Sequence, residues 1–458
     1  MRPPVRRLAI RASVAAVLLA FTVGGWLAYQ TLAIGVAYKA KMLCSGVFVA
    51  GRQPEAVLAE IQVDDLAPLR YIDGTVDRDA HTATARALGL LTRQALFRPG
   101  LGCALLLNRP AASADDGQRV GGALVARATD QEATSPADER NAVRLRPVIA
   151  RAFSEPDISR RRRTLAVVVM QHGRIVAEQY ADGIESHTPL PGWSMAKSVM
   201  NALTGVLVGR GLLARDAPVP IPEWQQAGDP RAAITLDHLL HMSSGLAFDE
   251  GMTGPRSDVV QMLFQQPDAS AFAIDKTLRN PPGTHWDYSS GTTNILARVM
   301  RNVLPASEYA AFPRRALFDR IGMSSAVLET DAAGTFVGSS YMYATARDWA
   351  RFGVLYLQDG VWNGERVLPE GWVKFSFSPA PADRAHQYGA HFWLQVPEGY
   401  AGADPRLPVS AFHAAGHEGQ FVTIVPSREL VIVRLGLTRY GGAWDHAAFV
   451  REVLSALD

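Results

Sequence analysis

Two strand–turn–strand patterns, far apart in the sequence, constrain the fold of this chain more than any other feature. The first, at 164–183, joins a near-continuous apolar run to an alternating run through a Gln-His-Gly turn at 171–173, which is a clear hairpin signal. The second, at 419–437, has the same form with its turn at 426–428. Helical patterns lie between them, at 195–209, 236–242 and 346–357. Strands at both ends with helices between predict an α+β fold with an antiparallel sheet covered by helices, rather than alternating βα units.

The first 41 residues predict a membrane helix. Residues 12–38 include no charged side chain. Positive charges flank them: Arg2, Arg6, Arg7 and Arg11 before, and Lys39 and Lys41 after. A helix rises about 1.5 Å per residue, so this stretch can cross a hydrocarbon core of about 30 Å. Because arginines before such a helix stay in the cytoplasm, we expect a single-pass protein of the inner membrane with its remaining chain on the periplasmic side. A cleaved signal peptide is the alternative, although its apolar region is usually about 7 to 15 residues long.

Composition divides the rest of the chain into three parts. Residues 42–108 predict a small β-rich cap, because short alternating runs are separated by turn residues. Residues 109–144 are rich in Ala, Ser, Asp and Pro and have little apolar periodicity, as a linker has. The main domain is therefore expected at 145–458. An oxidising compartment would allow the two cysteines, Cys44 and Cys103, to form a disulfide, and two buried free thiols are the alternative.

The charge balance argues against nucleic acid as a partner. The formal net charge is only +2, and a nucleic-acid-binding domain normally carries a basic stripe. Outside the N-terminus the only basic run is Arg160–Arg163, which we expect in a solvated connection. The sequence leaves the oligomeric state open.

The most informative local pattern is the start of the predicted helix near residue 195. Ser194 and Lys197 stand one helical turn apart, so the hydroxyl and the amine can meet on one face. Serine needs a neighbouring base to act as a nucleophile, and a lysine in an apolar pocket has a lowered pKa and can be that base. Free N–H groups at a helix start can also hold an oxyanion. A capping serine followed by a lysine that reaches to solvent would give the same pattern.

Two later segments favour the catalytic interpretation of Ser194 and Lys197. Tyr288 follows a Pro-Gly turn and precedes an apolar helix, and His417, Glu418 and Gly419 come directly before a strand. Together with Ser194 and Lys197, these segments resemble the serine β-lactamase and penicillin-binding protein superfamily, whose signatures are S-x-x-K, Y-x-N and K-T-G. Stretches at 234–246 and 344–373 look like its class C, esterase and 6-aminohexanoate-dimer hydrolase branch. The resemblance covers roughly 164–458 and implies an antiparallel sheet flanked by helices plus an all-helical subdomain.

The resemblance also implies roles for individual residues. Ser194 would be the acylated nucleophile and Lys197 its hydrogen-bonded partner. Tyr288 would carry the proton to the leaving group, with Lys197 keeping the phenol partly ionised. The oxyanion hole would be formed by the N–H groups of Ser194 and Gln420. The substrate would be bound by Ser290, His417 and Gly419.

Two departures from the signatures bear on the substrate. Ser290 stands where Y-x-N has asparagine, and His417 stands where K-T-G has lysine. A histidine and a short hydroxyl bind a carboxylate and orient an amide less well than lysine and asparagine do. The sequence therefore favours a serine hydrolase acting on an ester or a linear amide, without metal or organic cofactor. A β-lactamase, a peptidase for D-amino-acid peptides of the cell wall, and a catalytically silent membrane-tethered binding protein are the alternatives.

Two other enzyme classes fit the sequence poorly. His413 and His417, and separately His238 and His241, have spacings found in metal sites, but glycines interrupt a helix around the first pair and the second lacks an obvious third ligand. An α/β-hydrolase would place the nucleophile in G-x-S-x-G, and the second glycine is replaced by Ala196.

Overall fold

The centre of the molecule is a five-stranded antiparallel sheet with the order β12-β13-β14-β5-β6. The computed structural model describes residues 3–107, 136–251 and 254–458. The strands are β5 (Thr164–Gln171), β6 (Arg174–Tyr180), β12 (Phe412–Gly416), β13 (Gln420–Val425) and β14 (Leu430–Gly436). Both predicted hairpins are present, and β14 pairs with β5 to join them. Seven of the eight residues of β5 are buried, which explains its continuous apolar run.

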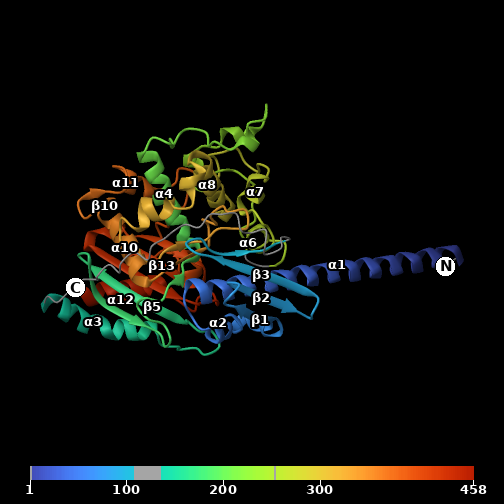
Figure 1. The fold of residues 1–458 in the computed structure, drawn as a ribbon, viewed down its shortest axis with the longest axis horizontal. Helices are drawn as coiled ribbons and strands as arrows, with labels where there is room; N and C mark the ends of the chain where they lie inside the picture. Colours follow the sequence, from blue (N-terminus) through green and yellow to red (C-terminus); the bar gives the residue numbers. More distant parts are fainter. Residues whose placement is uncertain (1–2, 108–135, 252–253) are drawn as a thin grey trace.

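Helices cover both faces of this sheet (Figure 1). On one face α3 (Pro136–Ala152) and α12 (His446–Leu457) pack their apolar side chains, such as Leu145 and Val450, against Val167 and Ile432. On the other face lies α10 (Ala346–Leu357). Beyond α10 is a helical region made of α4 (Ala196–Gly209), α5 (Leu236–Leu240), α6 (Asp258–Phe264), α7 (Ala269–Ile274), α8 (Ser290–Val303), α9 (Ala306–Tyr309) and α11 (Trp372–Ser376). The α+β architecture expected from the sequence is confirmed.

Short strands connect the sheet to the helical region. They are β7 (Leu190–Pro191), β9 (Met342–Ala344) and β8 (Val327–Leu328), which form a three-stranded sheet in that order, and the pair β10 (Val361–Trp362) and β11 (Glu365–Arg366). The chain leaves β7 through the 3₁₀ turn Trp193–Met195 and enters α4. This connection places Ser194 between the sheet and the helical region.

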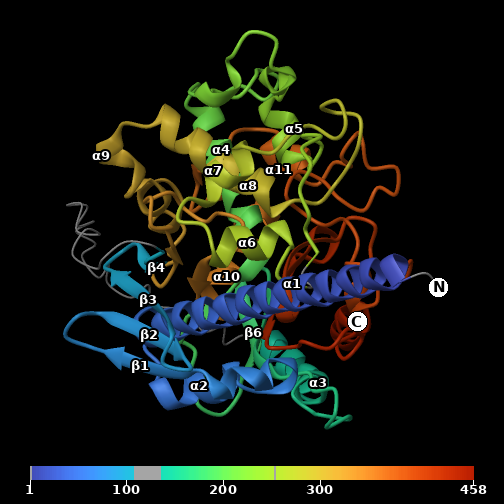
Figure 2. The same cartoon turned by 90° about the vertical axis from the view of Figure 1, so that its right-hand side faces the viewer.

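The N-terminal part of the chain is one long helix with a small sheet packed along it. Helix α1 (Pro3–Cys44) projects from the molecule, and Figure 2 shows it crossing the front of the body with its N-terminal end free. Large apolar side chains near that end, including Leu19 and Phe21, are exposed, and burial begins at Ala33. By length and composition α1 can cross a membrane. Against it lie α2 (Pro54–Ile61) and the four-stranded sheet β1 (Asp73–Asp77), β2 (Thr82–Ala87), β3 (Leu91–Arg98) and β4 (Gly102–Leu105).

The boundaries between the parts of the chain that composition predicted differ from those in the structure. Helix α1 continues past residue 41 to Cys44, and residues 45–49 form a π turn instead of starting a strand. Of the expected linker, 109–135 lies outside the described residues, while 136–144 are the first turns of α3. Its polar first turns masked a helix whose apolar residues, from Leu145 on, are held by the sheet. The main domain therefore includes 136–144.

Helix α1 is tied to the main domain by a buried ion pair. The Lys41 ammonium donates to the Glu329 carboxylate, and the two side chains are 1% and 0% exposed. Glu329 also accepts hydrogen bonds from Ser45 Oγ at 2.9 Å and from the Cys103 N–H at 2.7 Å. A disulfide joins Cys44 to Cys103 beside this pair. Lys39, too, is buried and donates to carbonyl groups, so both lysines that follow the apolar stretch lie inside the protein.

Replacing Glu329 should destabilise the protein strongly, because it would leave the Lys41 ammonium buried without its carboxylate. We expect Glu329→Ala to lose about 3–5 kcal/mol of the free energy of unfolding. The matched control is Glu365→Ala, which removes a carboxylate that is 78% exposed in its pair with Arg320, and should cost about 0–1 kcal/mol. Urea unfolding of the full chain in detergent measures both changes. Equal losses in the two variants would show that the buried pair does not hold α1 to the domain.

Candidate active site

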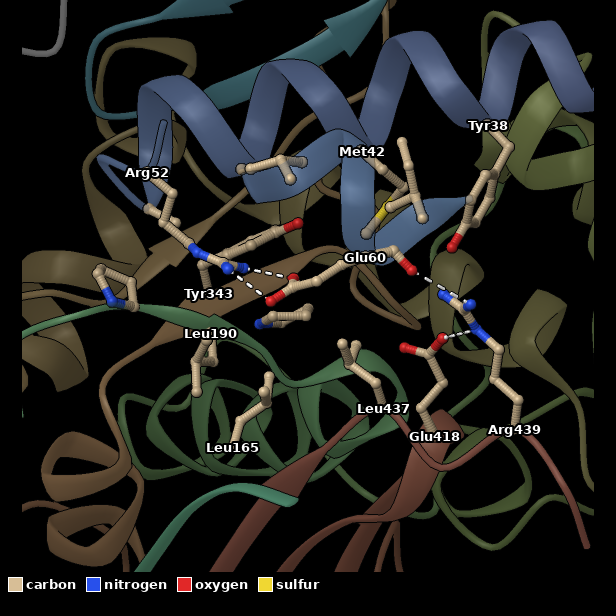
Figure 3. A pocket seen from close by; sticks show the side chains of 16 residues that line it. Tyr38, Met42, Arg52, Glu60, Leu165, Leu190, Tyr343, Glu418, Leu437 and Arg439 are labelled. Atoms are coloured by element: carbon tan, nitrogen blue, oxygen red, sulfur yellow. Dashed lines mark hydrogen bonds and ion pairs between the residues drawn. The ribbon is translucent and has the colours of Figure 1, made fainter. Parts of the chain in front are cut away.

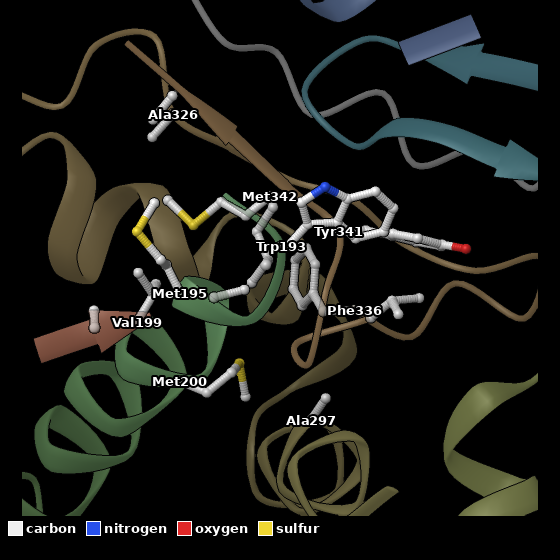
Figure 4. Close-up of a cluster of buried hydrophobic side chains, with 14 of the residues drawn as sticks. Trp193, Met195, Val199, Met200, Ala297, Ala326, Phe336, Tyr341 and Met342 are labelled. Atoms are coloured by element: carbon white, nitrogen blue, oxygen red, sulfur yellow. The ribbon is translucent and has the colours of Figure 1, made fainter. Parts of the chain in front are cut away.

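Ser194 lies in a turn whose neighbours are fixed in the core. Trp193 and Met195 are buried among Val199, Met200 and Met342 (Figure 4). Trp193 has a φ of +47°, in the left-handed region that non-glycine residues rarely occupy. Such strain persists only where the surrounding structure enforces it, and it is frequent at functional sites. The turn therefore holds the Ser194 hydroxyl in one place at the start of α4.

The amine of Lys197 is enclosed and fully hydrogen-bonded. The side chain is 1% exposed, and its Nζ donates to Ser194 Oγ at 3.0 Å, to Ser290 Oγ at 3.0 Å and to the Ser339 carbonyl at 3.1 Å. Burial lowers the pKa of Lys197 to about 8, and the negative charge of Glu250 opposes this shift. Near neutral pH a useful fraction of this amine is therefore uncharged and can accept a proton.

Tyr288 joins Ser194 and Lys197. Its hydroxyl is hydrogen-bonded to Ser194, and the Lys197 Nζ lies 4.9 Å from the centre of its ring. Burial and the Glu250 charge raise the pKa of Tyr288 well above its usual value, and the hydrogen bond with Ser194 opposes the rise. The apolar surroundings of Tyr288, which include Tyr388 and Trp393, thus act against the partly ionised phenol that the sequence analysis expected.

The sequence suggested that Ser290 binds the substrate, but in the structure its side chain is enclosed. It is 1% exposed and begins helix α8. Its Oγ accepts from Lys197 and donates to Glu250 Oε1 at 2.5 Å, while its backbone N–H donates to Glu250 Oε2 at 2.7 Å. The hydroxyl is therefore a link between the amine and a carboxylate. Glu250 was missed by the sequence analysis because nothing in its local sequence relates it to α4 or α8.

The hairpin of β12 and β13 supplies a backbone N–H next to Ser194. At His413, both the N–H and the carbonyl bond to Trp393, at 2.7 and 2.9 Å, on the side of β12 away from β13. Hydrogen-bonded and non-bonded pairs alternate along antiparallel strands, so the pair Gly416 and Gln420 is hydrogen-bonded and the His417 N–H points outward like that of His413. A Cβ added to Gly416 would lie 3.1 Å from the Ser194 nitrogen. The outward N–H is thus beside the Ser194 turn.

The pairing of β12 with β13 bears on Gln420, which the sequence analysis expected to be the second donor of the oxyanion hole. The Gln420 N–H is used by the Gly416 carbonyl in the ladder, and its side chain bonds to both backbone groups of Gly436. The N–H of His417, by contrast, lies outside this ladder and beside the Ser194 turn. The His417 imidazole is exposed and meets the edge of the Trp193 ring, with 5.5 Å between ring centres.

The residues after His417 hold the hairpin rather than a substrate. Glu418 is buried and accepts from Trp193 Nε1 at 3.1 Å and from Arg439 Nε at 2.9 Å. Arg439 also donates to the carbonyl of Glu60, in α2, at 3.3 Å (Figure 3). Gly419 has a φ of +80°, and a Cβ there would lie 2.4 Å from an Arg434 nitrogen, so Gly419 faces the interior and not a substrate. Glu418 thus links the Ser194 turn, the hairpin and the N-terminal part.

A pocket lies behind this link, between the N-terminal part and the main sheet (Figure 3). Its lining includes Tyr38, Met42, Tyr343, Glu418 and Arg439, but none of Ser194, Lys197 and Tyr288.

The histidine pairs are in unlike surroundings: His413 is buried against Thr423 and His417 is exposed, while His241 bonds to Asp237. In the described residues there is no group of three or more His, Cys, Asp or Glu side chains that could hold a metal ion.

Comparisons with known proteins agree with this architecture. The Beta-lactamase family model matches residues 149–453. A 6-aminohexanoate-dimer hydrolase from Paenarthrobacter ureafaciens is 26% identical over 305 residues, which cover 61% of this chain and 75% of that protein. Two solved structures have the same fold. EstCE1, described as a hydrolase with promiscuous acyltransferase activity, has a TM-score of 0.56 and 16% identity, and the match covers 70% of this chain and 100% of that one. A family VIII carboxylesterase has a TM-score of 0.53 and 16% identity, and the match covers 69% of this chain and 96% of that one.

The sheet order and the helical region above it define a protein of the β-lactamase-like fold class, a family whose members include hydrolases. The family match covers the whole of the central sheet and the site. The chain belongs to the beta-lactamase family.

Proposed function

We propose that the protein is a serine hydrolase that cleaves an ester or a linear amide through an acyl-enzyme on Ser194. The observation that carries the proposal is the contact of 3.0 Å between the Ser194 hydroxyl and the enclosed amine of Lys197. A lysine that is buried and part of the time uncharged is the base that a serine nucleophile needs. The hydrolases and esterases among the similar proteins support the same reaction type.

The arrangement provides a complete proton path. Uncharged Lys197 accepts the Ser194 proton as the oxygen attacks the carbonyl carbon. The resulting oxyanion is held by the N–H groups of Ser194 and His417. The protonated Tyr288 hydroxyl, hydrogen-bonded to Ser194, donates its proton to the leaving group and is reprotonated by Lys197. Water then attacks the ester on Ser194 by the reverse sequence of transfers.

The residues near the nucleophile favour an uncharged acyl substrate. The third signature has His417 where a carboxylate-binding lysine would stand, and the Ser290 hydroxyl is already occupied by Lys197 and Glu250. Neither residue provides the strong, charge-assisted contact that holds a β-lactam carboxylate or a peptide terminus. We therefore infer that short-chain esters and linear amides such as an aminohexanoate dimer are better substrates than β-lactams or D-amino-acid peptides.

A fluorophosphonate probe tests the nucleophile and the base together. We expect it to label the wild-type chain and not Ser194→Ala, and Lys197→Ala should label more slowly by a factor of about 10² to 10⁴. Because only the uncharged amine accepts a proton, kcat/KM for a p-nitrophenyl ester should rise as the pH passes about 8 and then level off. A panel of esters, linear amides, D-amino-acid peptides and a chromogenic cephalosporin ranks the substrates. Labelling that persists in Ser194→Ala would contradict the proposal.

Two variants of one residue test the oxyanion hole. His417→Pro removes the N–H that faces Ser194, because proline has no amide hydrogen, and should lower kcat by a factor of about 10² to 10³. His417→Ala keeps that N–H and should stay within a few-fold of wild type. The comparison uses initial rates on the same p-nitrophenyl ester, with melting temperatures to show that both variants fold. Equal rates for the two variants would remove His417 from the oxyanion hole.

We also propose that α1 anchors the enzyme in the inner membrane, with the main domain on the periplasmic side. Large apolar side chains of α1, among them Leu18, Leu19 and Phe21, are exposed and not covered by the described part of the chain, and the helix is long enough to span. The disulfide between Cys44 and Cys103 suits an oxidising compartment. A cleaved signal peptide would remove most of this helix, whose last turns are part of the core.

Alkaline carbonate extraction tests the anchor. The wild-type chain should remain in the membrane pellet, and N-terminal sequencing should find the helix intact. Leu19→Arg with Phe21→Arg places two charges on the exposed part of α1, each costing about 2.5–3.5 kcal/mol in a membrane helix, and should move protein to the supernatant. Leu90→Arg, at an 89% exposed apolar residue beyond α1, is the control and should stay in the pellet. Wild-type protein found in the supernatant would disprove anchoring.

A further inference from the structure

We propose that Glu250 is a positioning residue for Lys197 and that it receives, through Ser290, the proton that Lys197 must lose before it can act on Ser194. The inference rests on the proposed function, since it explains how the base of that reaction becomes uncharged. It assigns a role to a carboxylate outside the three signatures.

The contacts form a continuous path from amine to carboxylate. Lys197 Nζ donates to Ser290 Oγ at 3.0 Å, and Ser290 Oγ donates to Glu250 Oε1 at 2.5 Å. Lys197 comes from α4, Ser290 from the first turn of α8, and Glu250 from the segment between α5 and α6. The hydroxyl is thus oriented to accept from one partner while it donates to the other.

The other two partners of Lys197 do not lead to such an acceptor. The Ser339 carbonyl is a backbone group that does not take up a proton at these pH values. Ser194 leads only to Tyr288, which is already protonated. The amine itself is almost out of contact with solvent, whereas Glu250 is partly exposed. Of the three hydrogen bonds of Lys197, the one to Ser290 is therefore the route by which its proton can leave.

The transfer is balanced. The ammonium of Lys197 gives a proton to Ser290 Oγ as the Ser290 hydroxyl gives its own to Glu250. An ammonium, a hydroxyl and a carboxylate thereby become an amine, a hydroxyl and a carboxylic acid. A positive and a negative charge disappear together, which lowers the desolvation cost in this enclosed site. Glu250 then releases the proton to water at the exposed side.

Burial brings the pKa values of Lys197 and Glu250 closer together. It lowers the pKa of Lys197 to about 8 and raises the pKa of Glu250 above its usual value, while the attraction between their charges opposes both shifts. Other titratable groups interact with this pair. Asp287 raises the pKa of Glu250. In turn, Glu250 raises the pKa values of Tyr288 and Tyr388, and Lys197 lowers that of His391. A proton can pass between Lys197 and Glu250 at a smaller cost than between a solvated pair.

A purely structural role for Glu250 has to be separated from this one. Its Oε2 accepts the N–H of Ser290 at 2.7 Å, so the carboxylate also caps the start of α8 and is favoured there by the helix dipole. Glu250→Gln keeps a carbonyl oxygen for that N–H but removes the charge and the proton acceptor. Ser290→Ala keeps both the charge and the capped N–H but breaks the path. The two variants therefore separate capping, charge and proton transfer.

The first measurement follows the protonation of Lys197 directly and does not depend on turnover. Lysine labelled with ¹³C at Cε is titrated by NMR in the full chain, and the Lys197 signal is assigned with Lys197→Arg. We expect a midpoint near pH 8 in the wild type and a midpoint lower by about one pH unit in Glu250→Gln, because an attractive charge has been removed. Asp249→Asn is the matched control: it neutralises the exposed neighbouring carboxylate, which accepts from the Gly251 N–H, and should leave the midpoint unchanged.

The second measurement is the pH profile of kcat/KM for a p-nitrophenyl ester. Glu250→Gln should move the acidic limb to lower pH and reduce the plateau, and Ser290→Ala should reduce the plateau by about ten-fold or more. Asp249→Asn should match the wild type in both respects. An unchanged midpoint and limb in Glu250→Gln, with only a lower melting temperature, would reduce Glu250 to a helix cap and overturn the proposal. An unchanged plateau in Ser290→Ala would overturn it as well.

These readouts distinguish the two proposals. If the Lys197 midpoint moves in Glu250→Gln while the fluorophosphonate probe fails to label Ser194, the coupling of Glu250 to Lys197 stands and the hydrolase function fails. If Ser194 is labelled and the ester is hydrolysed while the midpoint and plateau do not change, the function stands and the role of Glu250 fails.

Discussion

The burial of one amine is the constraint on which the site depends. Lys197 can be enclosed only because Ser194, Ser290 and the Ser339 carbonyl each accept one of its hydrogen bonds, since an unpaired buried cation would be very costly. Those acceptors come from the start of α4, the start of α8 and the segment before β9. The folding of three distant segments is therefore the condition for a buried lysine whose pKa is lowered to about 8 and whose amine is hydrogen-bonded to Ser194.

The N-terminal part of the chain belongs to the same unit. The buried Glu329 binds Lys41 of α1, and Arg439, which is held by the buried Glu418, donates to carbonyl groups at the end of α2, so both contacts join the main domain to the N-terminal segment. Buried ion pairs of this kind tolerate little movement, because separating the partners exposes each charge to an apolar interior. The hairpin that presents the His417 N–H is thus supported from behind by the N-terminal part. If α1 lies in a membrane, the site is held at a constant position relative to it.

Periodic patterns in the sequence predicted the elements that are long and locally encoded. The hairpins at 164–183 and 419–437 and the helices α4 and α10 lie where the spacing of apolar residues indicated. Prediction failed where burial comes from distant partners: the polar start of α3 looked like linker, and nothing in the sequence indicated that Lys39 and Lys41 are buried. A charged residue in a sequence gives no sign of a carboxylate or carbonyl that meets it from another segment.

By itself the sequence determined the chemistry of the central pair. The spacing of Ser194 and Lys197 places a hydroxyl and an amine on one helical face, whatever surrounds them. Only the tertiary structure decided which groups complete the site. The direction of each N–H in β12 depends on its register with β13 and made His417, not Gln420, the neighbour of Ser194. Glu250 reaches Ser290 because two segments without a common pattern pack together, and such contacts arise from the fold as a whole and not from local spacing.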